Sequence, residues 1–279
     1  MHLTGKQVFK HLLLLFVAVG ASQGMAQNYK NHTLSARSGP GLDSYREEGT
    51  SPLTYSGICL NLGGNLSFAW RRHCIDWRHR YALFLNQNTQ KTATSYGGTY
   101  HGSLGYLYRW TAPTHPSYRG WIGGGLGDQL FLSMNSSLGN AALGYSNFFD
   151  MDLRARVELD FKFRKKKEEK RFTAFGYVEL PVITRMKRPG FSHISNANAS
   201  SGLLELTDGT YNKHTKFFSG ISTETGIAYR LRNQNRIALF YAWHFRTTGD
   251  VSAYRFYDAQ HLFQCELTFN LKHRDHESK

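Results

Sequence analysis

The chain has 279 residues, of which 41% are hydrophobic, and a formal net charge of +14. Aromatic residues reach 14% and glycines number 27. This composition is typical of membrane β-barrels, which have aromatic girdles and glycines within their strands. The three cysteines, Cys59, Cys74 and Cys265, are odd in number and widely spaced, which excludes a disulfide framework and a cysteine-based metal cluster.

Much of the excess of basic over acidic residues lies in three short stretches, at residues 71–72, 164–171 and 272–279. All three fall on the same side of the membrane topology predicted below. Solvated basic turns account for them better than a nucleic-acid surface does. We therefore expect no nucleic-acid partner, while a contact with outer-membrane lipid or lipopolysaccharide stays open.

The N-terminus has the organisation of a secretory signal peptide. Lys6 and Lys10 precede an apolar run over residues 12–19, and small residues flank a cleavage site after Ala26. No later stretch approaches the roughly 20 consecutive apolar residues that a membrane-spanning helix requires. We expect a signal peptide at residues 1–26 and a single domain over residues 27–279.

The rest of the chain alternates between apolar and polar residues in short segments. The clearest is 151–163, where every odd position is apolar and every even position is charged. Residues 55–70 are taken as one strand through Gly63–Gly64, although a hairpin at that pair is the alternative. The predicted strands are residues 33–38, 55–70, 75–85, 100–110, 121–134, 151–163, 172–182, 217–231, 237–246 and 263–271.

The connections between these segments alternate in length. Those after Trp70, Trp110, Phe163 and Leu231 are short or strongly basic. Longer connections are predicted at residues 41–52, 86–98, 135–146, 184–213 and 247–258. Outer-membrane barrels have short periplasmic turns and long external loops, and two periplasmic termini require an even number of strands.

We therefore predict an all-β fold, an antiparallel transmembrane β-barrel of ten strands in the outer membrane of a Gram-negative bacterium. Eight or twelve strands would follow if the weak first strand or the Gly63–Gly64 region were misread. A soluble barrel alternates in the same way, but aromatic residues at strand ends and the asymmetry of the loops favour the membrane.

In a membrane barrel the charged residues at alternate positions of each strand face the lumen. The predicted lumen-lining residues are Asp76, Arg78, Arg80, Arg109, Asp152, Arg154, Arg156, Glu158, Asp160, Glu179, Glu224, His244, Arg246 and Glu266. Buried charges must be paired or hydrogen-bonded, so a salt-bridged plug is the first interpretation. The alternative is a narrow, porin-like conduit or ligand pocket in which Arg154 and Glu158 set the selectivity.

A predicted external loop carries a candidate catalytic segment. Residues 191–197 read Phe-Ser-His-Ile-Ser-Asn-Ala and resemble the His-x-Ser-Asn-Ala motif of the lipid A 3-O-deacylases, outer-membrane barrels that hydrolyse an acyl ester. The resemblance implies Ser195 as nucleophile, His193 as base, Asn196 as oxyanion donor and Glu205 as acid. We keep this hydrolase as the alternative to a non-enzymatic barrel.

A second resemblance extends over most of the chain. Residues 42–45 (Leu-Asp-Ser-Tyr), residues 51–57 (Ser-Pro-Leu-Thr-Tyr-Ser-Gly) and the aromatic final strand are similar to an uncharacterised family of secreted, barrel-like proteins from Gram-negative gut bacteria. Membership implies an outer-membrane location and no particular activity. The histidines are scattered without metal-ligand spacing, so we expect no metal and no cofactor; a soluble ligand or protein partner stays unidentified.

The non-enzymatic interpretation predicts that lipid A is unchanged by this protein. Mass spectra of lipid A should be identical in cells that produce the wild type and cells that produce Ser195→Ala. Ser192→Ala is the matched control, because it removes a hydroxyl from the same segment. An acyl chain lost with the wild type and Ser192→Ala, but retained with Ser195→Ala, would establish the hydrolase instead.

Overall fold

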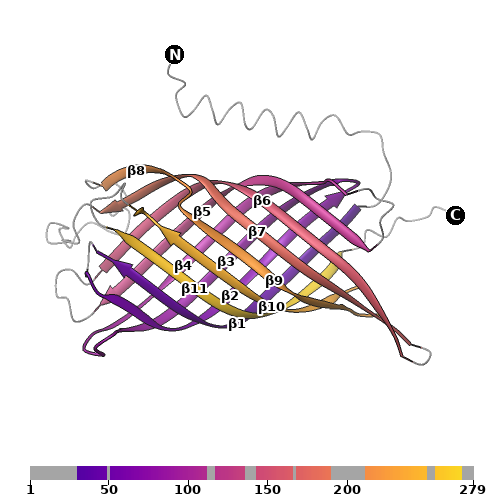
Figure 1. Ribbon diagram of the computed structural model, residues 1–279, viewed down its shortest axis with the longest axis horizontal. Coiled ribbons are helices and arrows are strands. Elements are labelled where there is room, and N and C mark those ends of the chain that lie inside the picture. Colours follow the sequence, from indigo (N-terminus) through magenta and orange to yellow (C-terminus); the bar gives the residue numbers. More distant parts are fainter. Residues whose placement is uncertain are drawn as a thin grey trace, which may run out of the picture.

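The computed structural model describes residues 30–48, 51–111, 117–135, 143–165, 168–189, 211–249 and 255–271. Its strands are β1 (Lys30–Glu47), β2 (Thr54–Trp70), β3 (His73–Asn88), β4 (Thr94–Arg109), β5 (Tyr118–Asn135), β6 (Leu143–Lys165), β7 (Glu168–Pro189), β8 (Tyr211–Phe217), β9 (Gly220–Arg230), β10 (Arg236–Thr247) and β11 (Phe256–Leu271). All pairings are antiparallel between neighbours, and pairing of β6 with β7 and of β1 with β11 closes the sheet into a barrel (Figure 1).

Strands β8 and β9 occupy one position in the wall. Both pair with β7, β8 along residues 183–189 and β9 along residues 171–179. The break lies at Phe218, whose φ is +53°, and at the buried Ser219. The barrel therefore has ten strand positions, which confirms the predicted number, and the predicted strand at 217–231 is two pieces with an earlier start.

The two ends of the barrel differ in their connections. We call the end that carries Lys30 and Leu271 the terminal end, and the opposite end the loop end. Only two residues, Arg71 and Arg72, join β2 to β3 at the terminal end, whereas residues 190–210 separate β7 from β8 at the loop end. The β6–β7 hairpin extends beyond the rest of the wall at the terminal end (Figure 1).

Strand β1 is longer than the sequence predicts. It continues to Glu47, pairing Asp43 with Gly57 of β2 and with Gln260 of β11, so the connection predicted at residues 41–52 is wrong over most of its length. Its outward positions include Ser38, Pro40 and Ser44 in place of large apolar residues, which weakens the alternation. Backbone pairing with β2 and β11 extends the strand over residues whose side chains do not alternate between apolar and polar.

Other strands also continue past their apolar positions at the loop end. β3 runs to Asn88 and β4 begins at Thr94, so the loop predicted at 86–98 contains only residues 89–93. The loops predicted at 184–213 and 247–258 shorten in the same way, to residues 190–210 and 248–255. These strand ends are polar, so the period-two signal stops before the backbone pairing does.

Strand β2 passes through Gly63–Gly64 without a turn, as predicted. Gly63 pairs with Arg37 of β1 and Arg80 of β3, and Gly64 continues the same registers. The hairpin alternative is therefore wrong. The alternation of β2 continues through both glycines, with Ile58, Leu60, Leu62 and Phe68 exposed on the outward face and Tyr55 and Cys59 buried on the inward face.

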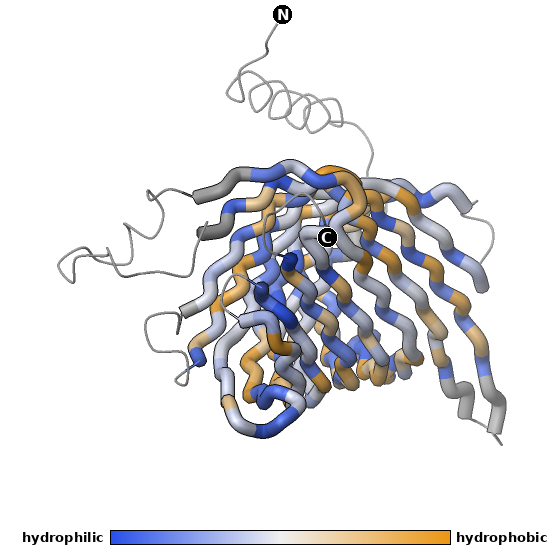
Figure 2. The backbone as a smooth tube through the Cα atoms, turned by 60° about the vertical axis from the view of Figure 1, so that its left-hand side comes forward, coloured by the Kyte–Doolittle hydropathy of each residue, from blue (hydrophilic) through white to orange (hydrophobic). Residues whose placement is uncertain are grey.

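The outward face of the barrel is apolar. Figure 2 shows hydrophobic and hydrophilic residues alternating along each strand, and Leu60, Leu83, Leu153, Leu239 and Phe263 each expose between 50% and 66% of their surface. The described residues contain no helix long and apolar enough to cross a membrane.

Three histidines have tyrosine partners on the neighbouring strand: His79 and His261 face outward, and His73 lies at the terminal end, where it also borders a cavity of the lumen. Their ring nitrogens lie at hydrogen-bond distance from tyrosine hydroxyls, at 2.7 Å for His73–Tyr106, 3.0 Å for His79–Tyr100 and 2.5 Å for His261–Tyr241. A polar group facing an apolar medium is costly unless it is hydrogen-bonded. The pairing makes these residues compatible with a lipid-facing wall.

An arginine on the outward face near the middle of a strand tests whether this face contacts lipid. Leu153→Arg should destabilise the barrel in lipid vesicles by about 2–4 kcal/mol, because a cation at the bilayer midplane is poorly solvated. Phe269→Arg, near the terminal end, should cost no more than about 1 kcal/mol. Urea unfolding in vesicles measures both, and a neutral effect of Leu153→Arg would mean that the face meets water.

Candidate functional site in the barrel lumen

The inward face of the strands carries the charged residues that the sequence assigned to the lumen. Eight of the fourteen are buried and six are half-buried, and several near the terminal end line a cavity. The full set is Asp76, Arg78, Arg80, Arg109, Asp152, Arg154, Arg156, Glu158, Asp160, Glu179, Glu224, His244, Arg246 and Glu266.

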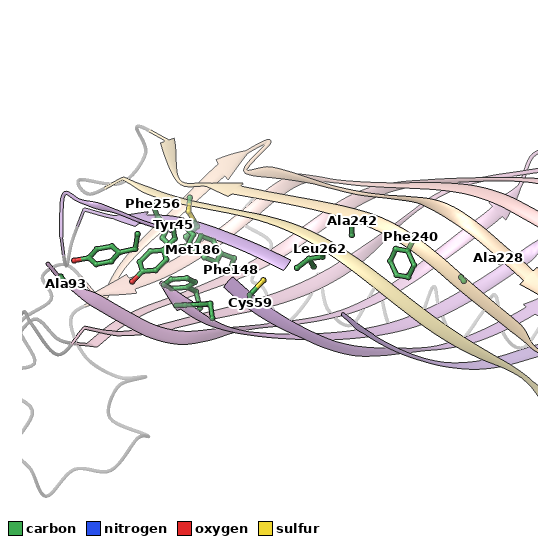
Figure 3. Packing of buried hydrophobic residues seen from close by; sticks show 14 residues of the cluster. Tyr45, Cys59, Ala93, Phe148, Met186, Ala228, Phe240, Ala242, Phe256 and Leu262 are labelled. Carbon is green, nitrogen blue, oxygen red and sulfur yellow. The ribbon is translucent and has the colours of Figure 1, made fainter. Parts of the chain in front are cut away.

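The loop end of the lumen is closed by apolar side chains. This aromatic cap consists of Tyr45, Tyr55, Phe84, Phe131, Phe148, Met186 and Phe256 (Figure 3). Phe131 packs edge-on against Phe256 with ring centroids 4.9 Å apart. The Tyr45 hydroxyl donates to Ser95, and Asn135 donates to the Tyr55 hydroxyl at 2.6 Å, so the polar atoms of the cap are also satisfied across the lumen.

Below the cap, Arg246 and Asp150 form a two-pronged ion pair. The two terminal guanidinium nitrogens of Arg246 on β10, Nη1 and Nη2, donate to the carboxylate of Asp150 on β6 at 2.7 Å and 2.6 Å. Two strands, β7 and β9, separate these positions in the wall, so the pair spans part of the lumen. Bidentate arginine–carboxylate pairs fix geometry as well as charge.

The middle of the lumen is crossed by arginines in contact with several carboxylates. Arg154 donates to Asp152 at 2.6 Å and 3.0 Å and lies 3.5 Å from Asp76. Arg78 donates to Asp76 at 2.6 Å and lies 3.6 Å from Glu224, on the opposite wall. Its guanidinium also sits over the Tyr177 ring, 3.8 Å from the centroid. These contacts join opposite sides of the barrel.

Two glycines make room for the Arg154 side chain. A Cβ at Gly105 would lie 2.0 Å from Arg154 Nη1, and a Cβ at Gly125 would lie 2.5 Å from Arg154 Cζ. Both glycines are on strands that Arg154 reaches across. Gly125 is one of the glycines at residues 123, 124, 125 and 127 that make the alternation of β5 indistinct in the sequence, and the buried guanidinium requires it.

A small void lies beside Arg80, His101 and His244. His101 Nε2 is 3.5 Å from Glu179, whereas neither ring nitrogen of the buried His244 has a hydrogen-bond partner within the described part of the chain. The void has a volume of about 20 Å³. That is room for about one water molecule, which His244 could bind. The lumen is thus nearly filled at this level.

The terminal end of the lumen is hollow. A cavity of about 600 Å³, which we call the vestibule, includes Arg71 and Gln234 of the terminal-end turns, and so opens at that end. Arg119, Arg156 and Arg236 surround the carboxylate of Glu158 on its wall. Side chains therefore fill the described lumen at the aromatic cap and where Arg78 contacts Tyr177, whereas the vestibule opens at the terminal end.

Sequence reasoning missed several residues of this network. Asp43 accepts hydrogen bonds from Asn86 and, at 3.0 Å, from Gln260, but it lies in the part of β1 that was predicted to be a connection. Arg119 precedes the predicted start of β5, and Arg236 precedes the predicted start of β10. Extending the period-two pattern of these two strands by one or two residues would have included Arg119 and Arg236.

The candidate catalytic residues His193, Ser195, Asn196 and Glu205 lie outside the described residues, as does the predicted signal peptide. Their convergence stays a prediction. Where the structure is described, no group of three or more His, Cys, Asp and Glu side chains could hold a metal ion.

The solved structures that this chain resembles are β-barrels. No protein-family model matches the sequence, and no curated protein matches it, so the resemblance to an uncharacterised family stays a prediction. The transport unit of the autotransporter AIDA-I from Escherichia coli is 9% identical with a TM-score of 0.48, over 93% of this chain and 97% of that chain.

Two further solved structures are similar at lower scores. The translocator domain of the autotransporter NalP from Neisseria meningitidis is 9% identical with a TM-score of 0.40, over 95% of this chain and 97% of that chain. Ail, the attachment invasion locus protein of Yersinia pestis, is 7% identical with a TM-score of 0.32, over 86% of this chain and 100% of that chain. None of these likenesses assigns an activity to the chain.

The space around Arg154 gives a direct test of the lumen packing. Gly125→Ala should destabilise the barrel by about 1–3 kcal/mol, because the new methyl group overlaps the guanidinium and a packed site cannot relax. Gly127→Ala is the matched control on the same strand, since its Cβ would meet nothing nearer than His101 Nε2 at 3.3 Å. Equal unfolding free energies of the two variants in detergent micelles would contradict the placement of Arg154.

Proposed function

We propose that the protein is a non-conducting outer-membrane β-barrel that acts through structure or binding rather than catalysis. Two features support the membrane location. Large apolar side chains cover the outward face of strands that are long enough to cross a bilayer at a tilt, and polar outward residues such as His79 have hydrogen-bond partners. Partner binding is proposed for the loop end, which carries the longer connections.

The observation that carries the proposal is the contact of Arg78 with both Tyr177 and Glu224 across the lumen. Ten strands form a barrel narrow enough for side chains to fill. The Arg78 contacts join β3 to β7 and β9, and the space beyond them has a volume of only about 20 Å³. The aromatic cap adds a second closed layer. Two such layers would block the passage of a solute.

Conductance across planar bilayers tests this proposal. The wild type should produce no current steps at any voltage, because the cap and the Arg78–Tyr177 layer both block the lumen. Current steps should appear in a variant that removes the large side chains of both layers. This variant combines Arg78→Ala, Tyr177→Ala, Phe131→Ala and Phe148→Ala.

The matched control truncates outward-facing neighbours, with Trp77→Ala and Val178→Ala in the same strands. This control should stay silent, because it leaves both lumen layers intact. The gel mobility of unboiled protein verifies that each variant is folded. Current steps from the wild type would overturn the plugged barrel and favour the conduit.

A further inference from the structure

We propose that the vestibule is a binding site for a small solute that carries two or more negative charges on phosphate or carboxylate oxygens. The solute would enter from the terminal end. The inference depends on the closed barrel described above and does not require the membrane assignment.

The first observation is the charge of the lining. The vestibule is lined by eight arginines and three glutamates, a net charge of +5, with no aspartate among the lining residues. Such a charge inside a closed wall attracts anions strongly, because low-dielectric walls focus the field toward the opening. A surface of solvated basic turns has no comparable enclosure.

The second observation is how the charges are arranged around Glu158. Arg119 lies 2.8 Å from this carboxylate, Arg236 lies 3.6 Å from it, and Arg156 donates a short hydrogen bond to it. The Glu158 side chain is only 4% exposed, whereas those of Arg119, Arg156 and Arg236 are 21%, 26% and 22% exposed. The carboxylate is therefore covered by the guanidinium groups, and the surface presented to the cavity is cationic.

The unused hydrogen-bonding capacity of these groups is the third observation. A guanidinium group has five N–H donors in a planar fork that matches phosphate and carboxylate oxygens. Arg109 donates to the Thr111 hydroxyl at 3.2 Å and forms no ion pair with a carboxylate in the described ranges. Asp160, 2.7 Å from Arg119, and Asp76, 2.6 Å from Arg78, add two acids to the three glutamates, so the eight arginines of the vestibule still outnumber these five acids.

Size and rigidity agree with a small organic anion. A volume of about 600 Å³ lies within the roughly 300–1,000 Å³ that small-molecule pockets occupy. Arg156 lies over the Trp121 ring at 5.4 Å from its centroid, which holds the guanidinium in position before a ligand arrives. The floor of the vestibule is the Arg78–Tyr177 layer, so a ligand could enter but not pass through.

Calorimetric titration of the full chain in neutral maltoside micelles tests the proposal, with inorganic pyrophosphate as the probe at low ionic strength. We expect one saturable site that weakens as salt is added. The double variant Arg109→Gln/Arg236→Gln should bind about 100-fold more weakly, or about tenfold for each charge-assisted hydrogen bond. Glu158 keeps Arg119 and Arg156 in this variant, so the wall remains paired.

Arg72→Gln is the matched control. Arg72 lies at the same end but outside the vestibule, where it donates to the Tyr108 hydroxyl, so its loss should change the affinity less than twofold. Neutral trehalose should not bind. No binding of pyrophosphate at millimolar concentration, or an equal loss in Arg72→Gln and in the double variant, would overturn the proposal. Either result would leave the proposal of a non-conducting, plugged barrel unaffected.

Discussion

Closure of the sheet is the constraint on which the rest of this structure depends. Once ten antiparallel strand positions close, every second side chain points into one narrow lumen and the others face outward. The inward set includes most of the charged residues of the strands, and an isolated buried charge is several kcal/mol too costly to persist. Pairing across the lumen follows, as with Arg246 and Asp150 or Arg78 and Glu224. The plug is therefore a consequence of barrel closure acting on this inward sequence.

Period-two alternation is a sufficient guide to the fold where the outward residues are large. Strand β6, with Met151, Leu153 and Val157 on one face, is unmistakable from sequence, and the ten-strand topology follows from such segments and the alternation of connection lengths. It fails for β1, where Ser38 and Pro40 take outward positions, and at strand ends, where both faces are polar. The information there is in the backbone ladder of the neighbours, and a single sequence does not display which neighbours a strand will have.

The lumen could be predicted as a list of residues but not as a set of contacts. Alternation assigns Arg154 and Glu179 to the inside, yet their proximity depends on register and shear, which determine which residues of distant strands meet. The role of Gly105 and Gly125 shows the limit clearly. In the sequence a glycine has no side chain that assigns it to either face of a strand, and in the structure these two positions leave the space that one guanidinium occupies. The vestibule is similar, because its charge excess arises where the arginines of several strands meet around few acids.

A charged plug is not the most stable way to fill a barrel, since well-packed apolar side chains of similar volume are often equally or more stabilising than buried ion pairs. The reason to keep charges inside lies in the sequence of the strand itself. β6 has 23 residues, and apolar residues at its inward positions as well would give a continuous apolar stretch as long as a membrane-spanning helix. For the proposed outer-membrane location such a stretch would be harmful, because it would be inserted as a helix in the first membrane that the chain meets. Charges at alternate positions keep β6 below that limit, and closure then brings the same charges into the paired network that fills the lumen, as in the contacts of Arg154 with Asp152 and Asp76.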